Sequence, residues 1–108
     1  MSSEKLQEFL RSGKDWARMR TSVPGVFVLK LPAYKGSPSR LAIELNPVGE
    51  DGSPKKRRGL VLRSQAELDE YRELFQYDKL AKLMDMLEAV NPKAEETKRR
   101  RGEEVIEL

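Results

Sequence analysis

Two hydrophobic patterns divide the chain: a period of two in the middle and a period of three to four toward both ends. The middle contains the runs VFVLKL (26–31), RLAIEL (40–45) and KKRRGLVLR (55–63). Apolar and polar residues alternate cleanly in RLAIEL, and in VFVLKL the larger residues Phe27, Leu29 and Leu31 alternate with Val26, Val28 and Lys30. Such alternation places successive side chains on opposite faces of a β-strand. With DWARMRTS (15–22) as a further strand, we predict four strands joined in chain order as an antiparallel meander.

Turn residues separate these strands. Val23-Pro24-Gly25 predicts a type II turn, because Pro fixes the first central φ and Gly supplies the positive second one. In the last run we expect Leu60 and Leu62 to point inward, while Val61 and its neighbours Arg57 and Arg63 face the other way.

Helical spacing flanks the predicted sheet. Leu6, Phe9 and Leu10 predict a short amphipathic helix over residues 3–11. Ser64 and Glu67 form a capping box, which predicts the start of a second helix. The apolar stripe of that helix consists of Leu68, Tyr71, Leu74 and Phe75.

A further apolar stripe follows, consisting of Leu80, Leu83, Leu87 and Val90. Its intervals of 3, 4 and 3 residues are those of a helix seam, and it is out of phase with the preceding stripe. We therefore expect a kink, or a new helix capped by Asp78, that ends at Asn91-Pro92. One monomer core does not bury both stripes without a bend, so the second stripe predicts a homo-oligomer, either a dimer or a tetramer.

These elements predict an α+β fold: a short helix, a four-stranded antiparallel meander and long C-terminal helices. Residues 1–92 are expected to form one domain, with an oligomerisation helix at 78–91. Residues 93–108 are expected to be a charged tail, whose EVIEL segment is a candidate to pair with an exposed strand edge.

Charge is segregated along the chain. Residues 11–63 hold twelve Lys and Arg against four acids, a net charge of +8, whereas the whole chain carries only +3. A concentrated positive charge on predicted β-structure indicates a polyanionic partner.

Composition excludes several function classes. The chain has no Cys and no His, which removes the usual zinc site, the strongest thiol nucleophile and the commonest general base. No phosphate-cradling Gly loop and no paired-carboxylate site is recognisable. We therefore expect a protein that is not an enzyme and needs no cofactor or metal. The start MSSEKLQEFL lacks the features of a signal peptide and no apolar run is long enough to span a membrane, so we expect a cytoplasmic protein.

Clustered cations are the first candidate binding residues. Lys55, Lys56, Arg57 and Arg58 run from a turn into a strand, where alternate residues point to opposite faces. A cationic run of this kind also protects an edge strand from aggregation. Phosphate contact is favoured because neighbouring strands carry further cations, namely Arg18, Arg20, Lys30, Arg40 and Arg63.

Aromatic residues are the second group of candidates. Trp16 alternates with Arg18 and Arg20, and unpaired bases stack on rings while cations contact the phosphates. Trp16 is equally interpretable as a core residue that closes the sheet against the first helix. Tyr34, in the loop after the second strand, is a better exposed candidate, whereas Tyr71 and Phe75 have the spacing of core residues.

The ordered segments DWARMRTSVPGVFVLKLP, IELNPVGEDGSPKKRRGLVLRS, AELDEYRELF and KLMDMLEAVNP resemble the ThermoDBP-like single-stranded DNA-binding proteins of thermophilic archaea. The resemblance covers roughly residues 14–92 and rests on the order of segments, not on one short motif. It implies a four-stranded antiparallel sheet packed with helices, a cleft that binds single strands with little sequence preference, and assembly through a leucine-rich helix. The residues at matching positions are Trp16, Arg18, Arg20, Lys30, Lys55 to Arg58 and Arg63.

The expected function is therefore binding of single-stranded DNA, without sequence specificity, by an oligomer. An RNA-binding protein is an alternative, because nothing in the sequence distinguishes a 2′-hydroxyl. A protein-interaction module with an acidic partner is another.

Overall fold

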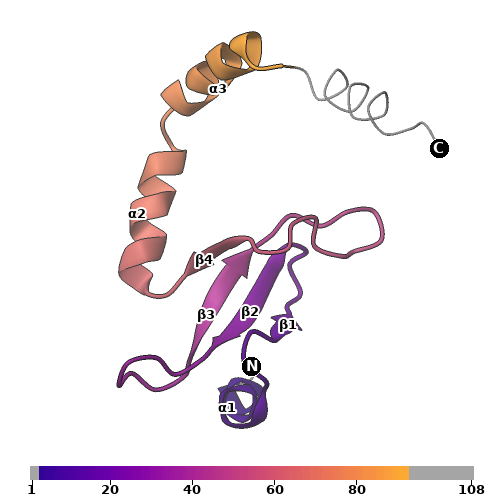
Figure 1. Cartoon of the computed structure of the whole chain (residues 1–108), viewed down its shortest axis with the longest axis vertical. Coiled ribbons are helices and arrows are strands. Elements are labelled where there is room, and N and C mark those ends of the chain that lie inside the picture. The colour runs from indigo at the N-terminus through magenta and orange to yellow at the C-terminus, as the bar shows by residue number, and fades with distance from the viewer. Residues whose placement is uncertain (1–2, 93–108) are drawn as a thin grey trace, which may run out of the picture. The chain divides into compact units, whose positions relative to one another are not determined.

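The computed structural model describes residues 3–92, which form seven elements (Figure 1). The chain separates into two compact units, one ending at Glu70 and the other beginning at Tyr71. This division falls inside a helix, whereas the sequence predicted a boundary after residue 92. The predicted tail at 93–108, including EVIEL, lies outside the described residues.

The first unit contains the predicted four-stranded sheet. Its strands are β1 (Arg18–Arg20), β2 (Val26–Leu31), β3 (Arg40–Leu45) and β4 (Leu60–Leu62). They are antiparallel and adjacent in chain order, which confirms the meander and the α+β class. The turn before β2 has the predicted geometry, with Gly25 at φ +91° and the Val26 N–H 3.0 Å from the Val23 carbonyl oxygen.

Strand register separates the sheet into two chemically different faces, because residues paired across strands lie on the same face. Phe27 pairs with Glu44, and Leu29 pairs with Ala42. One face, called here the arginine face, therefore contains Arg18, Arg20, Phe27, Leu29, Leu31, Arg40, Ala42, Glu44 and Val61. The opposite, aliphatic face contains Met19, Val26, Val28, Lys30, Leu41, Ile43, Leu45, Leu60 and Leu62. The apolar sets of β2 and β3 thus lie on opposite faces.

The core sits mainly on the arginine face. Leu29, Leu31 and Ala42 are buried there, with Val61 packed against them. On the aliphatic face, residues of the sheet line a hollow of about 270 Å³ together with Leu6 and Leu68.

Two strands are shorter than the sequence indicated. β1 begins at Arg18, so Trp16 precedes the strand and adopts a left-handed φ of +68°. β4 begins at Leu60, so the prediction that residues 55–58 run into a strand with alternating sides is wrong. They form a loop, held by contacts described below.

Three helices complete the described residues. α1 (Ser3–Ser12) matches the predicted first helix within a residue. α2 (Gln65–Phe75) begins at the predicted capping box, where the Glu67 N–H donates to the Ser64 hydroxyl oxygen at 3.2 Å. The Glu67 carboxylate accepts from the N–H of Arg63, one residue earlier than expected, at 2.7 Å.

The second stripe forms a separate helix, α3 (Lys79–Val90), as one of the two alternatives predicted. Asp78 occupies the N-cap position of α3, but its side chain makes no capping hydrogen bond. Asn91 is the C-cap residue at the other end of the helix. α2 and α3 have 11 and 12 residues, so these helices are shorter than the long ones expected. Of the helices in the described part of the chain, none has the length and apolar character to cross a membrane.

Candidate nucleic-acid interface

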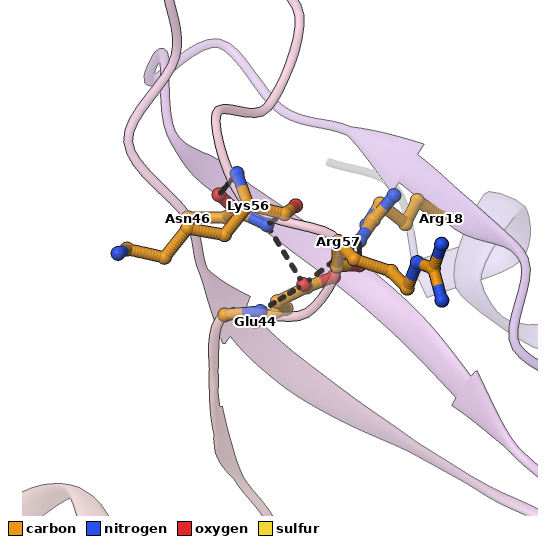
Figure 2. Close-up of polar contacts among 6 residues, drawn as sticks. Arg18, Glu44, Asn46, Lys56 and Arg57 are labelled. Carbon is orange, nitrogen blue, oxygen red and sulfur yellow. Dashed lines mark hydrogen bonds and ion pairs between the residues drawn. The ribbon is translucent and has the colours of Figure 1, made fainter. Parts of the chain in front are cut away.

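A buried carboxylate organises the arginine face. Glu44 is fully buried and accepts two hydrogen bonds from Arg18, at 2.6 Å from Nε and 3.1 Å from Nη2 (Figure 2). It also accepts from the backbone N–H of Gly59 at 2.7 Å and from the side-chain amide of Asn46 at 3.1 Å. Four donors from three parts of the chain therefore converge on one side chain.

These donors determine the charge state of Glu44. Burial alone would raise the pKa of this carboxyl. The hydrogen bonds from Arg18, Gly59 and Asn46 and the positive charge of Arg18 have the larger, opposite effect, so the pKa is lowered to about 2. The group is therefore ionised at neutral pH. The same contact raises the pKa of the Arg18 guanidinium, mainly through its hydrogen bonds to Glu44.

Asn46 fixes the loop that precedes β4. Its side chain accepts from the Lys56 N–H at 3.1 Å and donates to the Lys56 carbonyl at 2.8 Å, as a strand partner would (Figure 2). The Arg57 carbonyl accepts from Nη2 of Arg18. At Gly59 a Cβ atom would lie 2.2 Å from the Leu45 carbonyl oxygen, so the backbone approaches β3 more closely than a side chain permits. The backbone of residues 56–59 is thus held at three points.

The cations of this basic loop (Lys55–Arg58) are exposed. Among residues 3–92 the ion pairs are Arg18 with Glu44 and Arg11 with Glu8, so no carboxylate neutralises the loop. A backbone held in one conformation with exposed cationic side chains is suited to contact phosphates.

A hollow of about 420 Å³ lies on the arginine face, bounded by residues that the sequence separates widely. Two rings, Trp16 and Tyr34, and two cations, Arg40 and Arg63, line it, and the core residue Leu31 contributes apolar surface. Rings, cations and an apolar wall together match the chemistry of an unpaired nucleotide.

Both rings are positioned by backbone geometry. Trp16 is 48% exposed, and the guanidinium carbon of Arg58 lies 4.5 Å from its ring centroid. Tyr34 pairs with Ser37 across a tight turn in which Lys35 and Gly36 both have positive φ, the geometry of a type I′ turn. The Arg58–Trp16 stack joins the basic loop to the hollow.

The structure therefore brings together most of the predicted binding residues. Trp16, Tyr34 and Arg63 line the hollow, and Lys55 to Arg58 form the adjoining loop. The exposure of Trp16 disagrees with the alternative that it is a core residue.

Three predicted cations are engaged within the protein. Arg18 is paired with Glu44, and Arg20 donates from Nη1 to the Gly52 carbonyl at 3.1 Å. Lys30 is only 6% exposed and lies on the aliphatic face, so its assignment as a phosphate contact disagrees with the structure. The reason is that α1 ends beside it and supplies two carbonyl acceptors.

The sequence analysis did not identify Glu44 and Asn46 as organising residues. The available signal was the acid itself: Glu44 is the one acidic residue within the predicted strand RLAIEL of the basic half. A lone acid at an alternating strand position indicates a paired carboxylate when another strand of the same predicted sheet carries arginines, as residues 18 and 20 do here.

Comparisons with models of protein families, with curated proteins and with solved structures found no match for this chain. Geometry and charge are therefore the basis for assigning a function.

Replacing the central carboxylate tests the organisation of the loop. The pKa of Glu44 in the folded protein, about 2, lies below its usual value of 4.5. The ionised carboxylate therefore stabilises the folded state fully above about pH 4.5, and this stabilisation is lost as the pH falls toward 2. The difference between these two pKa values corresponds to about 3 kcal/mol in the free energy of unfolding at neutral pH. We expect Glu44→Gln to lose about that much by urea denaturation at pH 7, and to lose this part of the acid dependence.

Glu50→Gln, in an exposed loop, is the control and should change stability by less than about 0.5 kcal/mol. A Glu44→Gln protein with the parent's stability and acid dependence would contradict the role assigned to this carboxylate.

Proposed function

We propose that this protein binds single-stranded DNA with little sequence preference, through the basic loop and the ring-lined hollow, and that it does not act as an enzyme. The supporting observation is the juxtaposition of a cationic loop, which forms no ion pair within residues 3–92, with a hollow that holds two rings and two further arginines. The family resemblance noted above favours the same function.

The chemistry of the site favours a single strand over a duplex. Bases in a duplex are stacked on each other and paired, so their faces do not reach a protein ring, whereas unpaired bases stack on Trp and Tyr. Lys and Arg contact phosphates regardless of sequence. Stacking is equally insensitive to sequence, because every base has a π-face.

RNA and an acidic protein are the competing ligands. Competition among single-stranded DNA, duplex DNA, single-stranded RNA and an unrelated polyanion in one assay separates them. Preferential displacement by single-stranded DNA supports the proposal. Equal displacement by all four supports a general polyanion surface.

The basic loop should make binding depend on salt. Each phosphate contact to a single strand contributes roughly −0.7 to the slope of log affinity against log salt, so about four contacts give a slope near −3. Changing Lys55, Lys56, Arg57 and Arg58 together to Ser should weaken binding to all sequences alike and make the slope shallower, measured by fluorescence anisotropy at several salt concentrations.

The matched control removes four cations from the helices instead, by changing Lys5, Arg72, Lys79 and Lys82 to Ser. It makes the same change in net charge and should largely retain the slope of the parent. An equal loss in both variants would mean that net charge, and not the loop, governs binding.

Trp16 should contribute the stacking component. Its fluorescence is expected to fall when a single strand binds, and Trp16→Ala should lose about 1 to 3 kcal/mol of binding free energy with the fold intact. Trp16→Phe keeps a ring and should retain most of the affinity. Unchanged fluorescence together with unchanged affinity of Trp16→Ala would remove this ring from the interface.

We also propose that the protein is a homo-oligomer assembled through Leu80, Leu83, Leu87 and Val90 of α3. In the described part of the chain these side chains are all exposed, between 43% and 77%. A repeated aliphatic stripe that stays exposed in one copy is suited to pack against another copy. Linked copies would place several sites on one strand and raise the affinity for long strands.

Changing Leu83 and Leu87 to Asp should therefore give monomers in light scattering, with a larger loss of affinity for long oligonucleotides than for short ones. Lys82 and Ala89 lie on another side of the helix at 100° per residue, so changing both to Asp is the control and should leave the assembly intact. An oligomeric Leu83/Leu87 variant would place the interface elsewhere.

A further inference from the structure

Lys30 is a buried cation with an internal role. Its side chain is on the aliphatic face and only 6% exposed. The Nζ atom donates to the carbonyl oxygens of Leu10, at 2.5 Å, and Gly13, at 2.9 Å. Leu10 lies in the last turn of α1 and Gly13 directly follows the helix, where backbone acceptors lack helical partners and a positive charge is favourable. Lys30 therefore fixes the position where α1 ends.

The backbone of the same residue holds the other side of the connector between α1 and β1. The Lys30 carbonyl accepts from the Trp16 N–H at 2.7 Å, and the Lys30 N–H donates to the Ala17 carbonyl at 3.0 Å. One residue of β2 thus contacts both ends of the segment 13–17.

This segment contains one of the two left-handed backbone conformations that non-glycine residues adopt within residues 3–92. Trp16 has a φ of +68°, a region that residues with a side chain rarely adopt. Such a conformation persists only where the surrounding contacts hold it. The hydrogen bonds around it are those of the Lys30 backbone and one from the Ala17 N–H to the Lys14 carbonyl oxygen at 3.1 Å. The ring so placed lines the hollow.

We propose that Lys30 is a positioning residue for Trp16: its ammonium holds the connector, and the connector presents the indole ring to a nucleobase. The inference rests on the proposed binding of single strands at this site. It assigns to Lys30 a role opposite to that of the loop cations, because Lys30 contributes to stacking and contacts no phosphate.

Lys30→Met removes the ammonium and keeps a side chain of similar length. Because Trp16 is the only tryptophan, near-ultraviolet circular dichroism in the tryptophan band reports its orientation without any nucleic acid. We expect Lys30→Met to lose most of that signal while its far-ultraviolet spectrum stays that of the parent. An unchanged tryptophan signal would overturn the inference and leave the proposed function untouched.

Binding measurements distinguish positioning from phosphate contact. Lys30→Met should lower the affinity about tenfold at every salt concentration, within the range expected for losing a stacked base, and leave the salt slope unchanged. Lys55→Met, the control, should reduce the steepness of the slope by roughly 0.7. In a Trp16→Ala background Lys30→Met should have no further effect, because both changes remove the same contact. An equal loss in both backgrounds, or a shallower slope for Lys30→Met, would overturn the inference.

A measurement on the parent protein covers the case in which Lys30→Met does not fold. An amine-reactive reagent followed by mass spectrometry should label Lys30 slowly, with or without a single strand. Lys55 and Lys56 should label quickly in the free protein and become protected on binding. Rapid labelling of Lys30 that a strand suppresses would make it a phosphate contact and overturn the inference. Failure of the parent to bind any strand would instead overturn the proposed function.

Discussion

The buried carboxylate of Glu44 is the interaction on which the arrangement of the arginine face depends. A buried charge is costly unless charges and hydrogen bonds compensate it. Here Arg18, Asn46 and Gly59 compensate it, from β1, from the end of β3 and from the start of β4. Because Arg18 belongs to β1 and Gly59 directly follows the basic loop, satisfying one carboxylate fixes the edge strand and the basic loop together.

Because of this constraint, the net charge of residues 11–63 overstates the number of cations that a ligand can contact. The +8 of residues 11–63 suggests a broad cationic surface, but location decides which charges a ligand meets. Arg18 is neutralised by Glu44, and the ammonium of Lys30 is buried. Within residues 11–63, the exposed cations around the site are those of the basic loop, the two arginines of the hollow, and Lys35, whose ammonium lies 5.3 Å from the centroid of the Tyr34 ring. The proposed sites of phosphate contact are therefore fewer and more localised than composition alone indicates.

Local signals made the elements predictable, whereas the site depends on contacts distant in sequence. Alternation, the Pro24-Gly25 turn and the Ser64 capping box each act within a few residues, and all appear in the structure. The loop conformation of residues 55–58 was not predictable, because it follows from contacts with Asn46 and from the close approach at Gly59. The left-handed backbone of Trp16 likewise depends on a partner in β2.

The two components of the proposed binding are physically linked at one contact. Phosphate contacts depend on salt through counterion release, whereas base stacking depends on it little. Arg58 belongs to the loop, yet its guanidinium lies 4.5 Å from the centroid of the Trp16 ring. Under the proposed function, a base that stacks on that face would replace the guanidinium, and the released cation would become available to a phosphate of the same strand. Residues that share a partner in this way do not contribute additively. In the proposed binding, the stacking and electrostatic contributions are therefore coupled through Arg58, because a base on this face of the ring exchanges the contact with the guanidinium for stacking.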